Sequence, residues 1–221
     1  MLIAGIIGHE GKSKTANLIN SILSLTGRRV SIIDSKSLTN LGNHRIKSYI
    51  SELDKNNIDI LILKMEITDA EKENFDYLHI DVMIYIDKAD DLSEIDTKSY
   101  NDLIRKNFSL LDEKGIAIIN IDDHELIQFL QGMKYSIVTY GFNSKASITT
   151  SSIGDIVYKD NFMCCLQRTI SAKNGHLIEP QEYRIRMATA GLNTYNVLAA
   201  ASFAIINGVD LNSLDCSSQK N

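Results

Sequence analysis

Short apolar runs alternate with amphipathic stretches along the first 140 residues of the chain. The apolar runs have the length and composition of strands that are buried on both faces. They cover residues 2–7, 30–34, 58–63, 81–86, 115–121 and 136–140. The amphipathic stretches predict helices at residues 13–25, 43–53, 97–111 and, more briefly, from His124 onward. Because strands and helices alternate, we expect an α/β fold with a mostly parallel sheet and helices on both of its faces.

The pattern changes at about residue 146, where short apolar segments separated by turn residues replace the longer alternation. Gly, Asn and Asp gather in these turns, which are expected at residues 154–155, 159–161 and 173–175. The change predicts a small antiparallel β region between residues 146 and 187 that extends or flanks the main sheet. An alanine-rich helix should follow at residues 193–207, with Gly208 as its C-terminal cap.

The composition favours one globular domain. The chain has 221 residues, 44% of them hydrophobic, which suits a single domain at residues 1–215 followed by a polar tail at 216–221. A net charge of −5 without a basic stretch argues against a nucleic-acid partner. The longest apolar run, residues 197–206, is too short to cross a membrane. Three cysteines without a Cys-x-x-Cys pair fit a reducing, cytoplasmic location.

The strongest local signal is a glycine loop directly after the first predicted strand. Gly8 and Gly11 let the backbone turn sharply and come close to phosphate oxygens, and the start of the next helix offers partial positive charge. Lys12 would bring a full positive charge to the β and γ phosphates of ATP, and Ser13 a hydroxyl to Mg²⁺. The interval from Gly5 to Gly11 is one residue longer than in the usual Gly-x-x-x-x-Gly-Lys-Ser/Thr pattern, so the sequence predicts a variant phosphate loop.

A phosphate loop needs an acidic group for Mg²⁺ near the carboxyl ends of the strands. Glu66 follows the third predicted strand and is well placed to bind the metal directly or through water. Asp34, at the end of the second strand, is another candidate. Asp87, Asp90 and Asp91 follow the fourth strand. For any one of these acids, a solvated loop residue is an equal alternative.

Five segments resemble the central, ATP-binding domain of the Mur ligases, the ATP-dependent amide-forming enzymes of peptidoglycan precursor synthesis, and of their folylpolyglutamate synthase-like relatives. The glycine loop is similar to the family's Gly-x-Thr-Gly-Thr-Asn-Gly-Lys-Thr, and residues 65–68 are similar to its Met-Glu-Val-Ser. Residues 120–123, 139–142 and 191–200 resemble the family's Asn-x-Asp-Asp, Tyr-Gly-Phe and Gly-x-x-Asn-x-x-Asn-x-Leu-Ala-Ala. These segments occur in the family's order and cover nearly the whole chain.

The resemblance implies catalytic and metal-binding roles for the matching positions. Lys12 and Glu66 would be the catalytic residues, with Lys12 on the phosphates and Glu66 on Mg²⁺. Ser13 and Asp91 would be further metal ligands. Positioning and charge neutralisation carry most of the catalysis in such phosphoryl transfer.

The resemblance also implies binding partners. Gly8, Gly11, Lys12 and Ser13 would hold the phosphates of ATP, and Asn193 and Asn196 would hold the nucleotide from the start of the last helix. The family activates a carboxylate as an acyl phosphate, which an amine then attacks. The implied partners are therefore ATP, a UDP-muramyl-type or other carboxylate substrate and an amino acid, with separate protein partners as a further option.

Five positions depart from the family's pattern. His9 and Glu10 stand where Thr-Asn is usual, and Glu10 places a negative charge beside the predicted phosphate site. Asp91 occupies the position of a metal-binding histidine. Ile104 falls where the family carries a lysine, and Leu192 where a histidine is common.

Three hypotheses remain open at this point. The chain is the ATP-binding domain of a Mur-type carboxylate–amine ligase, without the N- and C-terminal domains that family members also have. Alternatively, it is a degenerate, non-catalytic module that binds nucleotide or a protein partner. The third hypothesis is an unrelated phosphate-loop ATPase or kinase.

Overall fold

The computed structural model describes residues 1–38, 40–75, 78–86, 97–123, 134–151, 162–186 and 192–214. The strands of its main sheet are β1 (Leu2–Ile7), β2 (Val30–Asp34), β3 (Ile60–Lys64), β4 (Ile80–Tyr85), β5 (Leu111–Asn120), β6 (Ser136–Tyr140), β7 (Ile148–Thr150), β8 (Phe162–Leu166) and β11 (Gln181–Ile185). This nine-stranded sheet has the order β11-β8-β7-β6-β5-β4-β1-β3-β2. A separate two-stranded sheet joins β9 (Ile170–Ser171) to β10 (Leu177–Ile178).

The pairing of the strands confirms the predicted fold class. Neighbouring strands from β2 to β7 run parallel. The two strands after them, β8 and β11, pair antiparallel and extend the same sheet. The β9–β10 hairpin turns within the predicted residues 173–175, where Gly175 has a φ of 83°.

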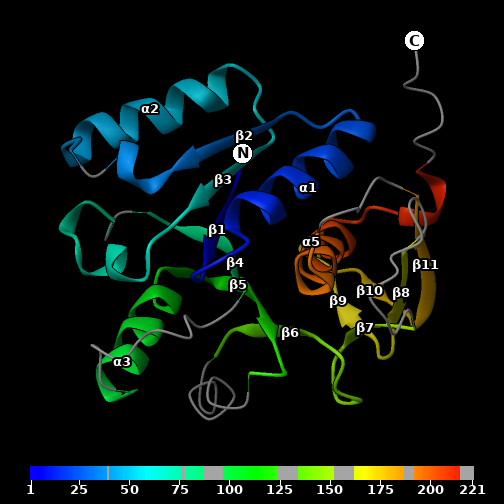
Figure 1. The fold of residues 1–221 in the computed structure, drawn as a ribbon. Coiled ribbons are helices and arrows are strands. Elements are labelled where there is room, and N and C mark those ends of the chain that lie inside the picture. The colour runs from blue at the N-terminus through cyan, green and yellow to red at the C-terminus, as the bar shows by residue number, and fades with distance from the viewer. Residues whose placement is uncertain are drawn as a thin grey trace.

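Helices cover both faces of the sheet. They are α1 (Lys12–Leu25), α2 (Asn43–Lys55), α3 (Thr97–Phe108) and α5 (Thr194–Ile206). Helices α1 and α5 lie on one face, and α2 and α3 lie on the other (Figure 1). Side chains alternate along each strand, so Ala4 and Ile6 of β1 pack on the α1–α5 side and Ile7 packs on the α2–α3 side. A central strand must therefore be apolar on both faces, which explains the unbroken apolar runs.

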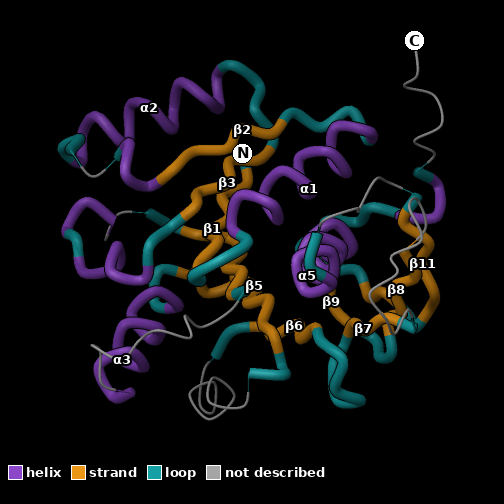
Figure 2. Tube along the Cα trace, in the orientation of Figure 1, coloured by secondary structure: helices purple, strands orange, loops and turns teal. Residues whose placement is uncertain are grey.

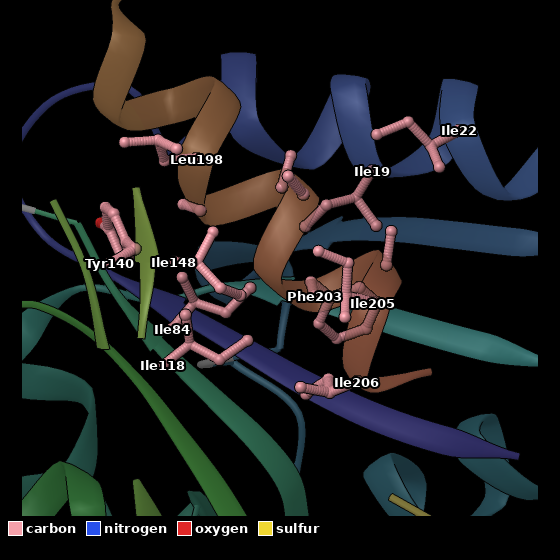
Figure 3. Close-up of a cluster of buried hydrophobic side chains, with 14 of the residues drawn as sticks. Ile19, Ile22, Ile84, Ile118, Tyr140, Ile148, Leu198, Phe203, Ile205 and Ile206 are labelled. Carbon is pink, nitrogen blue, oxygen red and sulfur yellow. The ribbon is translucent and has the colours of Figure 1, made fainter. Parts of the chain in front are cut away.

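Helix α5 is buried along almost its whole length. The sheet curls around it beyond β6 (Figure 2), and α1 packs beside it. Leu198 and Phe203 of α5 lie with Ile19 of α1 over Ile84 and Ile118 of the sheet (Figure 3). A helix that is apolar on every side is expected to be surrounded by protein. Gly208 follows the helix in the left-handed conformation, with a φ of 75°. Both the alanine-rich helix and its end near Gly208 agree with the sequence prediction.

The structure corrects the boundary between the third predicted helix and the fifth strand. Helix α3 ends at Phe108, and β5 begins already at Leu111. The pairing of β4 with β5 is irregular there, because Ile80 is opposite Leu111 whereas Val82 is opposite Ile116. Leu111 fits both a helical spacing from Phe108 and a buried strand position, so periodicity alone assigned it to the wrong element.

Some predictions concern residues that lie outside the described ranges. These are the short helix from His124, the turns at residues 154–155 and 159–161, and the polar tail at 216–221. Among the helices that the structure describes, none has the length and apolar character needed to cross a membrane.

Candidate functional site

The predicted site residues meet at the carboxyl ends of the central strands. Strand β1 has β3 on one side and β4 on the other, while its helix α1 leads to β2 at the edge of the sheet. In open α/β sheets, ligands bind at such a change of direction, outside the carboxyl ends of the strands. A cavity of about 490 Å³ lies here, walled by the glycine loop, the ends of β4 and β5 and the start of α5.

The glycine loop, residues 8–11, brings the start of α1 to this edge. Gly8 and Gly11 have φ values of 139° and 82°, which non-glycine residues rarely adopt. A Cβ atom at Gly11 would lie 2.2 Å from the side-chain nitrogen of Asn196 in α5. The first turn of α1 begins directly after Gly11, which has no side chain to cap its N–H groups. The loop therefore requires glycine at position 11, and it presents helix N–H groups beside the cavity.

Lys12 is the first residue of α1, and 13% of its side chain is exposed. Its Nζ donates to the carbonyl oxygen of Met65 at 3.0 Å and to Oε2 of Glu66 at 3.1 Å. The other oxygen of Glu66, Oε1, is 3.5 Å from Nζ of Lys36. The Glu66 carboxylate therefore stands between two ammonium groups.

A second lysine–acid contact lies beside the first. Lys64 ends β3, and its Nζ donates to Oγ of Ser13 at 3.1 Å. The same ammonium group is 3.5 Å from Oδ2 of Asp34, at the end of β2. Burial raises the pKa of Asp34, but the Lys36 backbone N–H and the charges of Lys64 and Lys36 outweigh it and hold that pKa below its ordinary value.

A buried carboxylate fixes the chain at Glu66. Asp69, which is fully buried, accepts a hydrogen bond from the Glu66 backbone N–H at 2.7 Å. Its other oxygen pairs with Lys72 at 2.5 Å. Because a buried carboxylate must be hydrogen-bonded or paired, Asp69 ties the loop after β3 to one conformation.

At the other end of the site, Asp122 organises the loop after β6 and the start of α5. Its carboxylate accepts from the backbone N–H groups of Phe142 at 2.6 Å and Asn143 at 3.0 Å, and from the Tyr195 hydroxyl at 3.2 Å. Burial, followed by the neighbouring Asp122 charge, raises the pKa of Tyr195 to about 12. Asn193 caps α5 by accepting from the Tyr195 backbone N–H at 2.9 Å.

The structure places most of the predicted site residues together. Lys12, Ser13 and Glu66 share one end of the site, and Gly11 contacts Asn196. Both Asn193 and Asn196 line the cavity. The predicted metal ligand Asp91 lies outside the described residues.

Sequence reasoning missed Lys36, Lys64, Asp69 and Asp122 as parts of the site. Lys64 could have been noticed, because it closes an otherwise apolar strand immediately before the segment that contains Glu66. Lys36 offers a weaker signal, two residues after Asp34. The positioning roles of the two aspartates depend on contacts that only the fold creates.

The described residues do not fit a directly bound Mg²⁺. The Ser13 hydroxyl accepts from Lys64, and both oxygens of Glu66 face lysines. Mg²⁺ requires several oxygen ligands at about 2.0–2.1 Å, and within the described ranges no three His, Cys, Asp or Glu side chains gather as a metal site. The chemistry available at this end is the binding of an anion by lysines and helix N–H groups.

Together, the fold and the site define an α/β domain with a glycine loop, a lysine and a helix start at the ligand-binding edge of a mostly parallel sheet. The family described as Mur ligase middle domain matches residues 6–204. The chain therefore belongs to the Mur ligase middle domain family, the ATP-binding domain of Mur ligases and folylpolyglutamate synthases.

The similar proteins are longer than this chain. The UDP-N-acetylmuramate–L-alanine ligase of Aquifex aeolicus is 25% identical over 215 residues, which are 92% of this chain and 41% of that protein. A structure of UDP-N-acetylmuramoyl-L-alanyl-D-glutamate–2,6-diaminopimelate ligase has a TM-score of 0.70 at 18% identity, and the match covers 96% of this chain and 44% of that one. The structure of the MurF ligase from Thermotoga maritima in complex with ADP has a TM-score of 0.59 at 16% identity. That match covers 97% of this chain and 48% of the MurF chain. The chain thus spans about 41% of the length of the Aquifex ligase.

Proposed function

We propose that this chain binds ATP at the carboxyl edge of its sheet, as the middle domain of a ligase that joins a carboxylate to an amine. The observation that carries the proposal is the conformation of Gly11. This residue adopts the left-handed backbone conformation at the start of α1 and packs against Asn196 of α5. This contact brings the start of α1 beside a cavity of about 490 Å³ that Gly11 and Lys14 help to line, and Lys12 follows Gly11 directly in the chain. Such a volume is within the range of about 300–1,000 Å³ that is typical of small-molecule sites.

Different residues would bind the phosphates and the rest of the nucleotide. The N–H groups at the start of α1 hydrogen-bond to phosphate oxygens, and Lys12 neutralises their charge. Asn193 and Asn196 face the cavity from α5 and offer amide groups to the rest of the nucleotide. Mg²⁺ bound to the nucleotide itself would supply further charge neutralisation on the phosphates.

The substrates of the proposed ligase follow from the relatives' names. These name UDP-N-acetylmuramate or its peptide derivatives as one substrate and an amino acid as the other. We propose a UDP-muramyl-type or related carboxylate and an amino acid for this chain, within peptidoglycan precursor synthesis. The matching region is 41% of the Aquifex ligase, so regions outside the match, or separate protein partners, would help to bind both substrates.

Isothermal titration of ATP into the purified chain, with MgCl₂ present, tests the binding proposal. Wild type should bind, and Lys12→Ala should reduce affinity at least about tenfold, because it removes a charge-assisted contact to phosphate. Lys55→Ala is the matched control, since Lys55 is exposed at the far end of α2. Equal affinity in Lys12→Ala and wild type would contradict the assignment of the phosphate site.

A second candidate is a nucleotide-binding module without ligase activity. The observation that favours it is that Ser13, Glu66 and Asp34, the described candidates for metal ligation, are each engaged by a lysine. Hydroxylamine converts an acyl phosphate into a stable hydroxamate, so it can report the first step of ligation. Hydroxamate formed from ATP and UDP-N-acetylmuramate would support the ligase. Tight ATP binding without hydroxamate or phosphate release would support the module.

A further inference from the structure

We propose that Lys64, supported by Lys36, takes over the charge of the divalent cation, so that this chain binds nucleotide phosphates without Mg²⁺. The inference rests on the proposed ATP binding and concerns how that same site neutralises the phosphates. Its starting point is the hydrogen bond of 3.1 Å from the Lys64 ammonium to the Ser13 hydroxyl. This hydroxyl is one of the groups that the sequence predicted as ligands of Mg²⁺.

A metal at Ser13 would lie close to the Lys64 ammonium group. A Mg²⁺ ion binds oxygen at about 2.1 Å. Together with the 3.1 Å contact, that places a metal on Ser13 Oγ within about 5 Å of the Lys64 Nζ. Two positive groups this close repel each other strongly at a partly buried site. An ammonium group at this position favours direct contact with an anion instead.

The backbone holds Lys64 in this position. In the sheet, Lys64 is directly opposite Asp34 of β2 and Ile6 of β1, so its Cα cannot move without breaking the parallel ladder. Its side chain is 21% exposed, and its ammonium group lies 3.5 Å from the Asp34 carboxylate. The backbone of Lys64 is therefore anchored in the sheet, and its ammonium group is held between the start of α1 and the end of β2.

The Glu66 carboxylate is also paired with lysine ammonium groups. Its two oxygens face Lys12 at 3.1 Å and Lys36 at 3.5 Å. Across the whole lysine cluster, the ammonium groups of Lys12, Lys36 and Lys64 face the carboxylates of Asp34 and Glu66. The pairing with Glu66 thus brings two ammonium groups to the same end of the site as Lys64, and ammonium groups bind phosphate through charge-assisted hydrogen bonds.

The decisive experiment compares two titrations of ATP into the full chain, one in EDTA and one in MgCl₂. Wild type should bind with similar affinity in both buffers. Lys64→Met should bind at least about tenfold more weakly in EDTA, because it loses one charge-assisted contact to phosphate. Added MgCl₂ should restore much of its affinity, since the metal then finds the Ser13 hydroxyl unoccupied. Lys64→Arg keeps the charge and should resemble wild type in EDTA.

Several outcomes would overturn the inference. Binding of ATP by wild type only in MgCl₂ would show that the chain depends on the metal after all, while leaving ATP binding itself intact. Unchanged affinity of Lys64→Met in EDTA would show that Lys64 does not contact phosphate. Absence of binding in both buffers would remove the inference together with the proposed function. Lys55→Met, at an exposed position, controls for the loss of a lysine, and thermal melts confirm that each variant is folded.

Discussion

The two ends of the candidate site hold their charged groups in opposite ways. At the lysine cluster, the carboxylates of Asp34 and Glu66 are each 42% exposed and are held by ammonium groups at 3.1–3.5 Å. At the other end, Asp122 is held by two backbone N–H groups at 2.6 and 3.0 Å and by the Tyr195 hydroxyl. Exposed ion pairs exchange readily with water or a ligand, whereas backbone contacts persist only while the chain keeps its path. Substitutions at the lysine cluster should therefore change binding first, and those at Asp122 should change stability first.

The largest effect should follow a change at Gly11, where the two ends of the site meet. Gly11→Ala forces alanine into a φ of 82° and places its Cβ 2.2 Å from Asn196. We expect a loss of about 3 kcal/mol in the free energy of unfolding, together with loss of ATP binding. Chemical denaturation and ATP titration measure the two effects.

Gly27→Ala is the matched control for this prediction. Gly27 has a similar φ of 77°, but a Cβ there has no neighbour within 4 Å. The Gly27→Ala variant should lose only about 1 kcal/mol in the free energy of unfolding, from its strained backbone, and it should keep ATP binding. If both variants lost the same stability, the contact between Gly11 and Asn196 would have no energetic importance.

The next largest effect should come from Asp122→Ala. This variant leaves the backbone N–H groups of Phe142 and Asn143 without their carboxylate partner and removes the acceptor of the Tyr195 hydroxyl. We expect a loss of about 1–2 kcal/mol in the free energy of unfolding, because both N–H groups can still reach water. Asp102→Ala, on the exposed side of α3 with a side chain 64% exposed, should change stability by less than about 0.5 kcal/mol. An equal loss in both variants would contradict the contrast between the two ends.

The sequence predicted much of the fold because its signals are local. The central strands are apolar on both faces, and most of these runs are followed by a helical period, so the parallel sheet follows from periodicity. The glycine loop was equally visible, because Gly11, Lys12 and Ser13 are adjacent in the chain. Residues near 111 were misassigned because Leu111 satisfies both periods.

The remaining parts of the site depend on neighbours that only the sheet order defines. Lys64 meets Asp34 because β3 lies next to β2, although 30 residues separate the two in the sequence. Asp122 likewise reaches residues 142–143 through the pairing of β5 with β6. A charged residue at a strand end is common in sequences, and its partner becomes visible only when the order of the strands is known.

Among the variants within the site, the smallest stability effect, and the sharpest contrast with Asp122, should come from Asp34→Asn. Asparagine can still accept the Lys36 backbone N–H that Asp34 accepts at 3.1 Å, so the variant removes little besides the charge beside Lys64. For an exposed pair we expect a loss below about 1 kcal/mol at pH 7, with tighter ATP binding in EDTA because the lysine cluster becomes more positive.

The pKa of Asp34 is lowered from 3.8, so its stabilising contribution is present above that pH and is lost as the pH falls through the folded-state pKa. Unfolding measured from pH 7 down to about pH 3 should therefore show wild type and variant converging at the acid end. A loss of more than about 2 kcal/mol, or weaker ATP binding, would mean that Asp34 holds the chain as Asp122 does, and that the lysine cluster is part of the framework and not a ligand-facing surface.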